Sequence, residues 1–390
     1  MDMLREAERI KQDLVGLRRD LHMHPELSNE EFRTVGIVED TLRSLGIATK
    51  RIAGTGLIGL LKGNGPGKTV ALRADMDALP LADGKSVEYA SQVPGKMHAC
   101  GHDVHTAGLL GAAMLLSKHR EQFAGNVKFL FQPAEETTGG ALPMIEDGAL
   151  ANPKVDAVFG LHVMPQLKAG AIGISYGKAY AASDMFDVSI AGRASHGAAP
   201  HGGIDAIVVG AQVVTALQTF ASRNVDPVDS AVVTVGKFTG GYQRNIIADK
   251  VELSGIIRTL DPQTREFATI RVKEIIEGVA RSLQAEAVVS FTPSYPSVIN
   301  DKAMVDFVRG VAEGVVGKEN VVLIEKPTMG VEDFAYYLQK APGAFFQLGI
   351  GNEEKGIVHP LHSNLFDVDE AALPIAAAVH TGIVLGFLAR

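Results

Sequence analysis

The chain has 390 residues, of which 46% are hydrophobic and 21% charged, and its formal net charge is -8. A chain of this length is long for one hydrophobic core, so two domains are expected. The negative charge disfavours nucleic acid as a partner, and no apolar run approaches the roughly 18 residues needed to cross a bilayer. The single cysteine, Cys100, cannot form an intrachain disulfide, and the N-terminus lacks the apolar region of a signal peptide, so we expect a cytoplasmic protein.

Two amphipathic helices are expected near the N-terminus, over residues 4–21 and 31–45. The segment between them contains His22, His24 and Glu26, which could bind a metal ion. A proline and a serine in the same segment are more typical of a turn and a helix cap, so the structural interpretation is favoured.

Three apolar strands follow, and each of them runs directly into polar side chains. Because helical segments separate the strands, we expect a parallel sheet covered on both faces. Ligands bind beyond the carboxyl ends of the strands in such sheets, which predicts a site at that edge. The strands and the residues after them are 69–73 with Asp75 and Asp77, 126–131 with Glu135 and Glu136, and 155–161 with His162.

The stretch from Met97 to His105, M-H-A-C-G-H-D-V-H, lies between the first two of these strands. The apolar run 104–116 after it predicts a helix, for which Asp103 is the expected N-cap. A thiol and an imidazole, Cys100 and His102, at the start of a helix suit a borderline-soft divalent cation. Taken alone, the stretch fits a buried free cysteine beside solvated histidines equally well.

After residue 182 the pattern changes to strand, helix, strand, strand, helix, strand, the order of a ferredoxin-like domain. The segments are 184–190, 204–220, 231–238, 250–260, 263–283 and 286–291. Alternating strands and helices resume afterwards, so residues 183–293 are expected to be inserted into a catalytic domain formed by 1–182 and 294–390. The last part holds helices expected at 304–315, 331–338 and 370–388, a strand at 344–350, and the histidines His359 and His362.

The adjacent carboxylates Glu135 and Glu136 matter most for the predicted chemistry. Neighbouring side chains after a strand point in different directions, so one carboxylate can bind a metal ion while the other faces the reacting water. A metal ion lowers the pKa of water, and a nearby carboxylate can accept the proton. The mixed sulfur, nitrogen and oxygen donors exceed one tetrahedral site, which predicts two metal ions. A solvated helix start is the alternative for the two glutamates, but the polar residues at the other strand ends weigh against it.

Seven motifs extend this pattern over nearly the whole chain. They are R-A-D-M-D-A-L-P (73–80), H-A-C-G-H-D-V-H-T-A (98–107), F-Q-P-A-E-E (131–136), G-L-H-V (160–163), G-R-A-S-H-G-A-A-P-H (192–201), R-N-I-I-A-D (244–249) and M-G-V-E-D-F (329–334). In this order they resemble the co-catalytic metallo-amidohydrolases of the aminoacylase and carboxypeptidase superfamily, and within it the hippurate hydrolase and auxin-conjugate hydrolase branch. The resemblance implies an α/β, zinc-exopeptidase-like catalytic domain with an inserted lid or dimerisation domain, and hence a homodimer or higher homo-oligomer.

The resemblance also implies a set of metal ligands and two supporting carboxylates. Two divalent ions per subunit (zinc, manganese, cobalt or nickel) would be bound by Cys100, His102, Glu136, His162 and His362. Glu135 would be the general base, and Asp77 would hold a ligand in place. His362 is assigned in preference to His359 by the alignment of the late loop, because spacing does not decide between them.

Four further positions are expected to act on the substrate. His196 would reach the site of a partner subunit and polarise the scissile carbonyl, although a histidine that caps its loop is the structural alternative. Asn245 and Arg258 correspond to positions that hold the substrate carboxylate or the oxyanion, which suits the planar guanidinium, although a surface arginine on a strand fits Arg258 equally well. Gly330 is expected to be a glycine of close approach.

These residues predict hydrolysis of the amide bond of N-acyl amino acids, such as N-acetyl or N-benzoyl conjugates, with a metal-bound water activated by Glu135. The products would be a carboxylic acid and a free amino acid. A carboxypeptidase or dipeptidase acting on short peptides with the same site is the alternative. A non-catalytic metal-binding oligomer is a third possibility, against which Glu135 argues because a metal store needs no proton acceptor.

Overall fold

The computed structural model describes residues 2–389, and the chain forms two compact units. The second unit contains Lys178–Val298 and Pro327–Glu332, and the rest of the described chain forms the first unit. The inserted unit therefore extends a few residues beyond the expected 183–293 at each end. It also takes in a segment late in the chain, which contains Gly330 and which the sequence pattern assigned to the catalytic domain.

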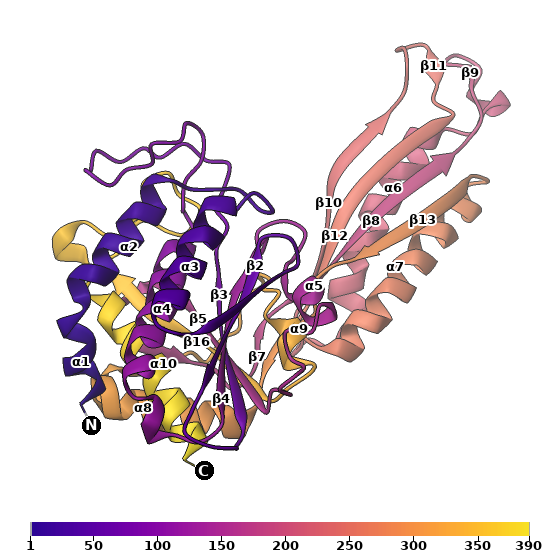
Figure 1. Ribbon diagram of the computed structural model, residues 1–390. Helices are drawn as coiled ribbons and strands as arrows, with labels where there is room; N and C mark the ends of the chain where they lie inside the picture. Colours follow the sequence, from indigo (N-terminus) through magenta and orange to yellow (C-terminus); the bar gives the residue numbers. More distant parts are fainter. Residues whose placement is uncertain (1, 390) are drawn as a thin grey trace. The chain divides into compact units, whose positions relative to one another are not determined.

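An eight-stranded sheet lies at the centre of the first unit (Figure 1), in the order β1-β2-β4-β3-β5-β16-β6-β15. The central pairs β4–β3, β3–β5 and β5–β16 are parallel, as is β6–β15, while β1–β2, β2–β4 and β16–β6 are antiparallel. The predicted mostly parallel sheet is confirmed. Its strands are β1 (Ala48–Ile52), β2 (Gly56–Lys62), β3 (Thr69–Asp75), β4 (Asn126–Gln132), β5 (Ala157–Lys168), β6 (Ile172–Ile174), β15 (Val321–Leu323) and β16 (Gly343–Gly351).

Helices flank this sheet, and every residue of β3 and β16 is buried, as expected for strands covered on both faces. The helices α4 and α10 pack against each other and against the central strands. Among the described helices, none combines the length and apolarity that crossing a bilayer requires. The helices of this unit are α1 (Met3–Arg9), α2 (Lys11–Met23), α3 (Phe32–Ser44), α4 (His102–Lys118), α5 (Ala141–Glu146), α8 (Lys302–Val316), α9 (Ala335–Leu338) and α10 (Ala372–Leu388).

Two helix predictions are wrong in detail. The segment 4–21 is two helices that meet at Ile10, and the helix expected at 331–338 is only the short α9.

The predicted N-cap of α4 is also wrong. The N-cap is Gly101, in the left-handed conformation at φ 82°, and not Asp103. Asp103 lies in the first turn of α4 and is fully buried, where its carboxylate pairs with Arg18 at 2.8 Å. The N-cap prediction considered only neighbouring residues, so it could not include this contact with a distant arginine.

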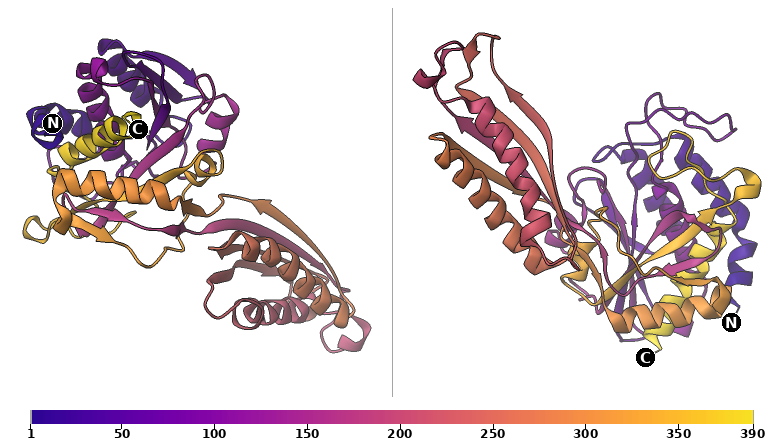
Figure 2. Two further views of the ribbon diagram at one scale, coloured as in Figure 1. Left: turned by 90° about the horizontal axis from the view of Figure 1, so that it is seen from below. Right: turned by 180° about the vertical axis from the view of Figure 1, so that it is seen from behind.

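The second unit has the predicted ferredoxin-like order of elements around a four-stranded antiparallel sheet, β10-β12-β8-β13. Its two long helices pack on one face of this sheet (Figure 2), and the residues between them form a separate hydrophobic core. The elements are β8 (Ala182–Ala191), α6 (Ala206–Thr219), β10 (Ala231–Gly240), β12 (Lys250–Thr259), α7 (Pro262–Ser282) and β13 (Glu286–Pro293). The short strands β9 (Ser195–His196) and β11 (Ile246–Ile247) pair with each other, and β7 (Gly177–Tyr180) pairs with β14 (Val298–Asn300).

Candidate active site

The carboxyl ends of neighbouring parallel strands bring the polar residues of the first unit together. Asp75 is the last residue of β3, Glu135 follows β4 closely, and His162 lies within β5. His102 is the first residue of α4, whose chain enters from the end of β3. This is the edge of the sheet at which the sequence predicted a site.

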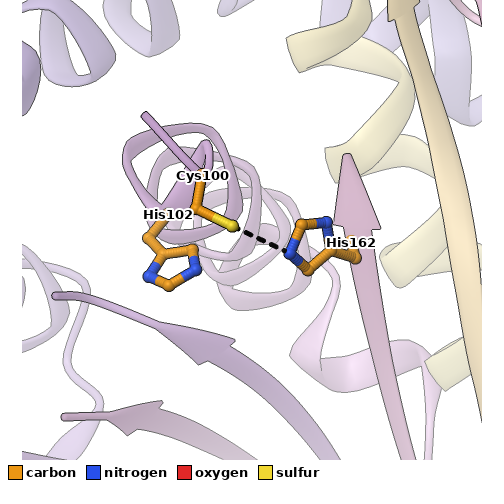
Figure 3. Close-up of side chains that lie close together, drawn as sticks. All are labelled: Cys100, His102 and His162. Carbon is orange, nitrogen blue, oxygen red and sulfur yellow. Dashed lines mark hydrogen bonds between the residues drawn. The ribbon is translucent and has the colours of Figure 1, made fainter. Parts of the chain in front are cut away.

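Several groups of potential metal ligands occur among the described residues, and within each group the ligand atoms are within 4.8 Å of one another. One of them, Asp75 with His102 and His105, lies at the end of β3, and three others include Cys100 or both Glu135 and Glu136. The first of these three is Cys100, His102 and His162, shown in Figure 3, where Cys100 Sγ lies 3.5 Å from His162 Nε2. The other two groups are Cys100 with Glu136 and His362, and His102 with Glu135 and Glu136. Cys100 belongs to two of the groups, so one thiolate could contact two ions.

Two atoms in this cluster are buried without a hydrogen-bond partner in the described structure, His102 Nε2 and Glu136 Oε1. They lie 3.9 Å apart, and His362 Nε2 is 3.4 Å from the same carboxylate oxygen. A buried polar atom without a partner is costly, and a divalent cation would supply one. Mixed thiolate, imidazole and carboxylate donors suit such an ion, so the residues present fit a metal centre.

The imidazole rings are held so that the same nitrogen of each faces the cluster. His102 directs Nδ1 toward Asp77 Oδ1 at 3.2 Å, which leaves Nε2 for a ligand bond. His162 donates from Nδ1 to the carbonyl oxygen of Val163 at 2.8 Å, which turns Nε2 toward Cys100. Burial and the neighbouring His105 lower the pKa of His162 to about 3, so this ring is neutral, as a metal ligand must be.

The cluster carries more negative than positive charge. Burial, followed by the carboxylates of Glu136 and Glu135, raises the pKa of the Cys100 thiol well above its ordinary value. Burial lowers the pKa of His102, but the carboxylates of Asp75 and Asp77 outweigh it and raise that pKa to about 10. A bound cation would compensate this charge and allow Cys100 to ionise.

Asp77 connects His102 to the loop that bears the two glutamates. Its carboxylate accepts hydrogen bonds from the backbone N–H of Glu135 at 3.1 Å and of Glu136 at 3.0 Å. The hydroxyl of Ser28 donates to the same carboxylate at 2.7 Å. Asp77 therefore orients both an imidazole and the neighbouring loop without itself joining a ligand group.

Asp75 lies deeper and bonds to residues that the sequence analysis did not single out. His105 Nδ1 is 2.6 Å from Asp75 Oδ1, and the fully buried Arg73 donates to the other oxygen at 2.5 Å. The N–H of Val163, next to His162, donates to His105 Nε2 at 2.9 Å. His105 was detectable as the residue one helical turn after His102 in H-D-V-H, on the same face of α4.

The late loop contributes His362, whereas His359 belongs to none of the ligand groups found among the described residues. His362 has a positive φ of 62°, which is uncommon for a residue other than glycine. Its N–H donates to the carbonyl oxygen of Ala99 at 2.8 Å, beside Cys100. The strained backbone conformation of His362 is thus held by a hydrogen bond to the segment that carries Cys100.

His196 and Asn245 belong to the second unit, where they lie close together. His196 is paired with Ile246 between β9 and β11, and the N–H of Gly197 donates to the carbonyl oxygen of Asn245 at 2.8 Å. The His196 side chain is exposed, and its Nδ1 accepts the N–H of Ala198 at 3.0 Å. In the neutral ring, Nε2 therefore carries the proton.

Arg258 and Gly330 also belong to the second unit. Arg258 is half-buried on β12, its Nη1 has no hydrogen-bond partner in the described structure, and burial lowers the pKa of its guanidinium. A Cβ on Gly330 would come no closer than 3.4 Å to Thr328, so packing within the chain does not require glycine there. The roles of these two residues and of His196 and Asn245 toward a substrate stay predictions.

Residues 71–386 match the family described as Peptidase family M20/M25/M40. The chain belongs to this family. The resemblance to amidohydrolases and carboxypeptidases that the motifs indicated is confirmed by this match and by three relatives.

The relatives of this M20 family member are named for related hydrolytic activities. The N-acetyl-L-cysteine deacetylase of Bacillus subtilis (strain 168) is 41% identical, over 93% of this chain and 85% of the relative. The IAA-amino acid hydrolase ILR1-like 4 of Arabidopsis thaliana is 41% identical, over 96% and 86%. Thermostable carboxypeptidase 2 of Saccharolobus solfataricus is 39% identical, over 98% and 97%.

A solved structure of a Bacillus subtilis protein, described as a dinuclear metal-binding peptidase of the M20 family, shares the fold. Its TM-score is 0.87 at 33% sequence identity, and the match covers 98% of this chain and 99% of that chain. The M20 member described here thus has a structural relative that is described as a dinuclear metal-binding peptidase, and it has candidate ligand groups of its own.

Proposed function

We propose that this M20 family member hydrolyses the amide bond of N-acyl amino acids and releases a carboxylic acid and a free amino acid. The observation that carries the proposal is the position of Glu135 beside the ligand cluster. Glu135, Glu136 and His102 form one group of closely spaced donors, and Asp77 holds the backbone of both glutamates. A metal store would need Glu136 but has no use for a second carboxylate facing the same space.

Two divalent ions would be held by the donors of the first two ligand groups, which share Cys100. When bound, such ions lower the pKa of water and polarise a carbonyl oxygen. Zinc, manganese, cobalt or nickel fits thiolate, imidazole and carboxylate donors. The five proposed ligands are Cys100, His102, Glu136, His162 and His362.

The remaining chemistry falls to side chains. Glu135 takes a proton from the attacking water and passes it to the leaving amine as the amide bond breaks. His196 of a partner subunit donates from Nε2 to the developing oxyanion, because its Nδ1 is engaged by Ala198. Arg258, with Asn245, binds the free carboxylate of the amino acid, which would give its unpartnered Nη1 an acceptor.

A homodimer formed through the second unit is part of this proposal. The strand β10 is at the edge of its sheet, and unpaired edges favour association with another chain. The apolar side chains of Phe238 on β10, and of Ile207 and Val208 on α6, are exposed. A second copy of the chain would cover this apolar surface.

We also propose that the protein works in the cytoplasm. Cys100 is a free thiol, and a thiol that ligates a metal ion must stay reduced. Reducing conditions of this kind are typical of the cytosol.

The test is hydrolysis by protein that has been stripped of metal and then reloaded separately with Zn²⁺, Mn²⁺, Co²⁺ or Ni²⁺. Hippurate and a set of N-acetyl amino acids are compared with dipeptides by kcat/KM. We expect the reloaded protein to prefer the N-acyl amino acids and the stripped protein to be inactive. A clear preference for dipeptides would favour the carboxypeptidase alternative, which the relative from Saccharolobus solfataricus supports. No hydrolysis of either class with any of the four metals would refute the proposal.

The variant Glu135→Gln separates catalysis from metal binding. Loss of a general base typically costs about 10²–10⁴ in rate, so kcat should fall by that factor while the metal content stays unchanged. An active Glu135→Gln protein would remove Glu135 from the mechanism.

A further inference from the structure

Three consecutive backbone N–H groups in the loop after β4 donate to buried carboxylates. The N–H groups of Glu135 and Glu136 donate to Asp77, as described above. The N–H of Ala134, the residue before them, donates to Glu31 Oε1 at 2.9 Å. The loop that carries the proposed general base is therefore held by two carboxylates from distant parts of the chain.

Ala134 has an unusual backbone conformation, with a positive φ of 56°. A residue with a Cβ pays roughly 1–2 kcal/mol to adopt the left-handed conformation, so something must hold it there. The bond from Glu31 acts directly on this residue, immediately before Glu135. If Ala134 relaxed to a negative φ, the peptide that follows it would turn and the Glu135 side chain would point elsewhere.

Glu31 is at the N-cap of α3, yet its side chain does not cap that helix. The carboxylate is fully buried, and its second oxygen accepts the hydroxyl of Thr55 at 2.5 Å. Capping is done by Glu26, whose carboxylate accepts the N–H groups of Arg33 at 2.9 Å and of Thr34 at 2.8 Å. Helix stability therefore does not explain why a carboxylate is buried at position 31.

We propose that Glu31 is a positioning residue, which holds Ala134 in the left-handed conformation and thereby directs the Glu135 carboxylate toward the reacting water. This inference rests on the proposed role of Glu135 as general base. Glu31 acts through the backbone and does not touch the substrate. A misplacement of about 1 Å at a reacting group can cost about 10²-fold in rate, so a shift of the loop has a large effect.

The test compares Glu31→Ala and Glu31→Gln with the matched control Glu26→Ala in the full-length, zinc-loaded protein. The control loses a carboxylate at the start of the same helix but none that touches the loop. Steady-state kinetics with hippurate, zinc content, and hydrogen exchange of a peptide covering residues 131–140 are measured for each.

We expect Glu31→Ala to lower kcat by about 10–10²-fold, with KM within about twofold of the wild type, because orientation and not binding is lost. Its zinc content should be unchanged, and the N–H of Ala134 should exchange faster. Glu31→Gln should recover most of kcat, since its carbonyl oxygen can still accept the N–H of Ala134 while Thr55 reverses its hydroxyl. Glu26→Ala should keep the wild-type kcat and exchange.

Several results would overturn the inference. They are an unchanged kcat in Glu31→Ala, unchanged exchange in the loop, loss of zinc in place of loss of rate, or the same fall in kcat in Glu26→Ala. If Glu31→Ala does not fold, Glu31→Asp withdraws the carboxylate by one methylene and is judged by the same measurements. The exchange result is independent of activity, so a wild-type protein that fails to hydrolyse any substrate would refute the proposed function and leave the contact between Glu31 and Ala134 to be judged separately.

Discussion

His102 Nε2 and Glu136 Oε1 lie 3.9 Å apart, and each is buried without a hydrogen-bond partner in the described structure. The two atoms are too far apart for a hydrogen bond to each other, and each would gain a partner from one of the two proposed cations. Asp77 fixes both sides of this gap, since it accepts from the His102 ring and from the Glu136 N–H. The separation of the two unpartnered atoms is therefore fixed by hydrogen bonds to Asp77 within the first unit.

Removal of metal should destabilise the protein, because an ion that binds only the folded chain stabilises it by mass action. At a free Zn²⁺ concentration of about 100 times Kd, the expected stabilisation is about 2.7 kcal/mol. We expect a higher thermal midpoint with Zn²⁺ than with a chelator, measured by calorimetry. In Cys100→Ser, which weakens a donor shared by two ligand groups, the difference should shrink. Equal midpoints with and without Zn²⁺ in the wild type would contradict a metal centre here.

His196→Ala should slow turnover without loss of metal. Removal of one preorganised oxyanion donor typically costs about 10²–10³ in kcat. If His196 serves the partner subunit, mixing His196→Ala with Glu135→Gln should restore activity, because a mixed dimer contains one complete site. Each variant alone is the control. Full activity of His196→Ala would refute the assigned role, and failure of the mixture to recover any activity would argue against action across subunits.

The ion pair between Arg18 and Asp103 should contribute strongly to stability. Both side chains are fully buried, and the guanidinium lies 2.8 Å from the carboxylate. Arg18→Leu would leave the buried Asp103 carboxylate paired with His22 but without the guanidinium, at a cost of about 3–5 kcal/mol in the free energy of unfolding, measured in urea. The neighbouring Arg19, whose side chain is 38% exposed and pairs with Glu370, is the matched control. Arg19→Leu should cost at most about 1 kcal/mol, and equal costs for the two variants would contradict this account.

Acid should destabilise the fold in part through His380. Burial lowers the pKa of His380 to about 3, whereas in the unfolded chain a histidine titrates near 6.5. Between these values the unfolded state binds the proton and the folded state does not, so stability falls as the pH falls.

The variant His380→Leu has no imidazole at this position and therefore takes up no proton there on unfolding. The free energy of unfolding is measured in urea at pH 7 and pH 5, with both proteins free of metal. When the pH is lowered from 7 to 5, the wild type should lose about 2 kcal/mol more of this free energy than the variant loses. The same difference at both pH values would show that His380 titrates alike in the folded and unfolded states.

The sequence by itself determined the fold class and indicated which polar side chains lie at one edge of the sheet. The alternation of apolar strands with helices indicates a sheet whose carboxyl ends face one way, and Asp75, Glu135 and His162 follow three such strands. The change of pattern after residue 182 indicated the inserted unit. These inferences are available from the sequence because periodicity and motif spacing are local properties that the chain carries before it folds.

Only the tertiary structure decided which side chains meet. Glu31 and Ala134 are 103 residues apart, and Arg18 and Asp103 are 85 apart, so no local pattern relates them. The choice between His359 and His362 also depends on tertiary structure, because both are histidines of the same loop. A hydrogen bond to Ala99 places His362 beside Cys100. Contacts between distant segments depend on how the sheet and helices pack, and packing is a property of the whole folded chain.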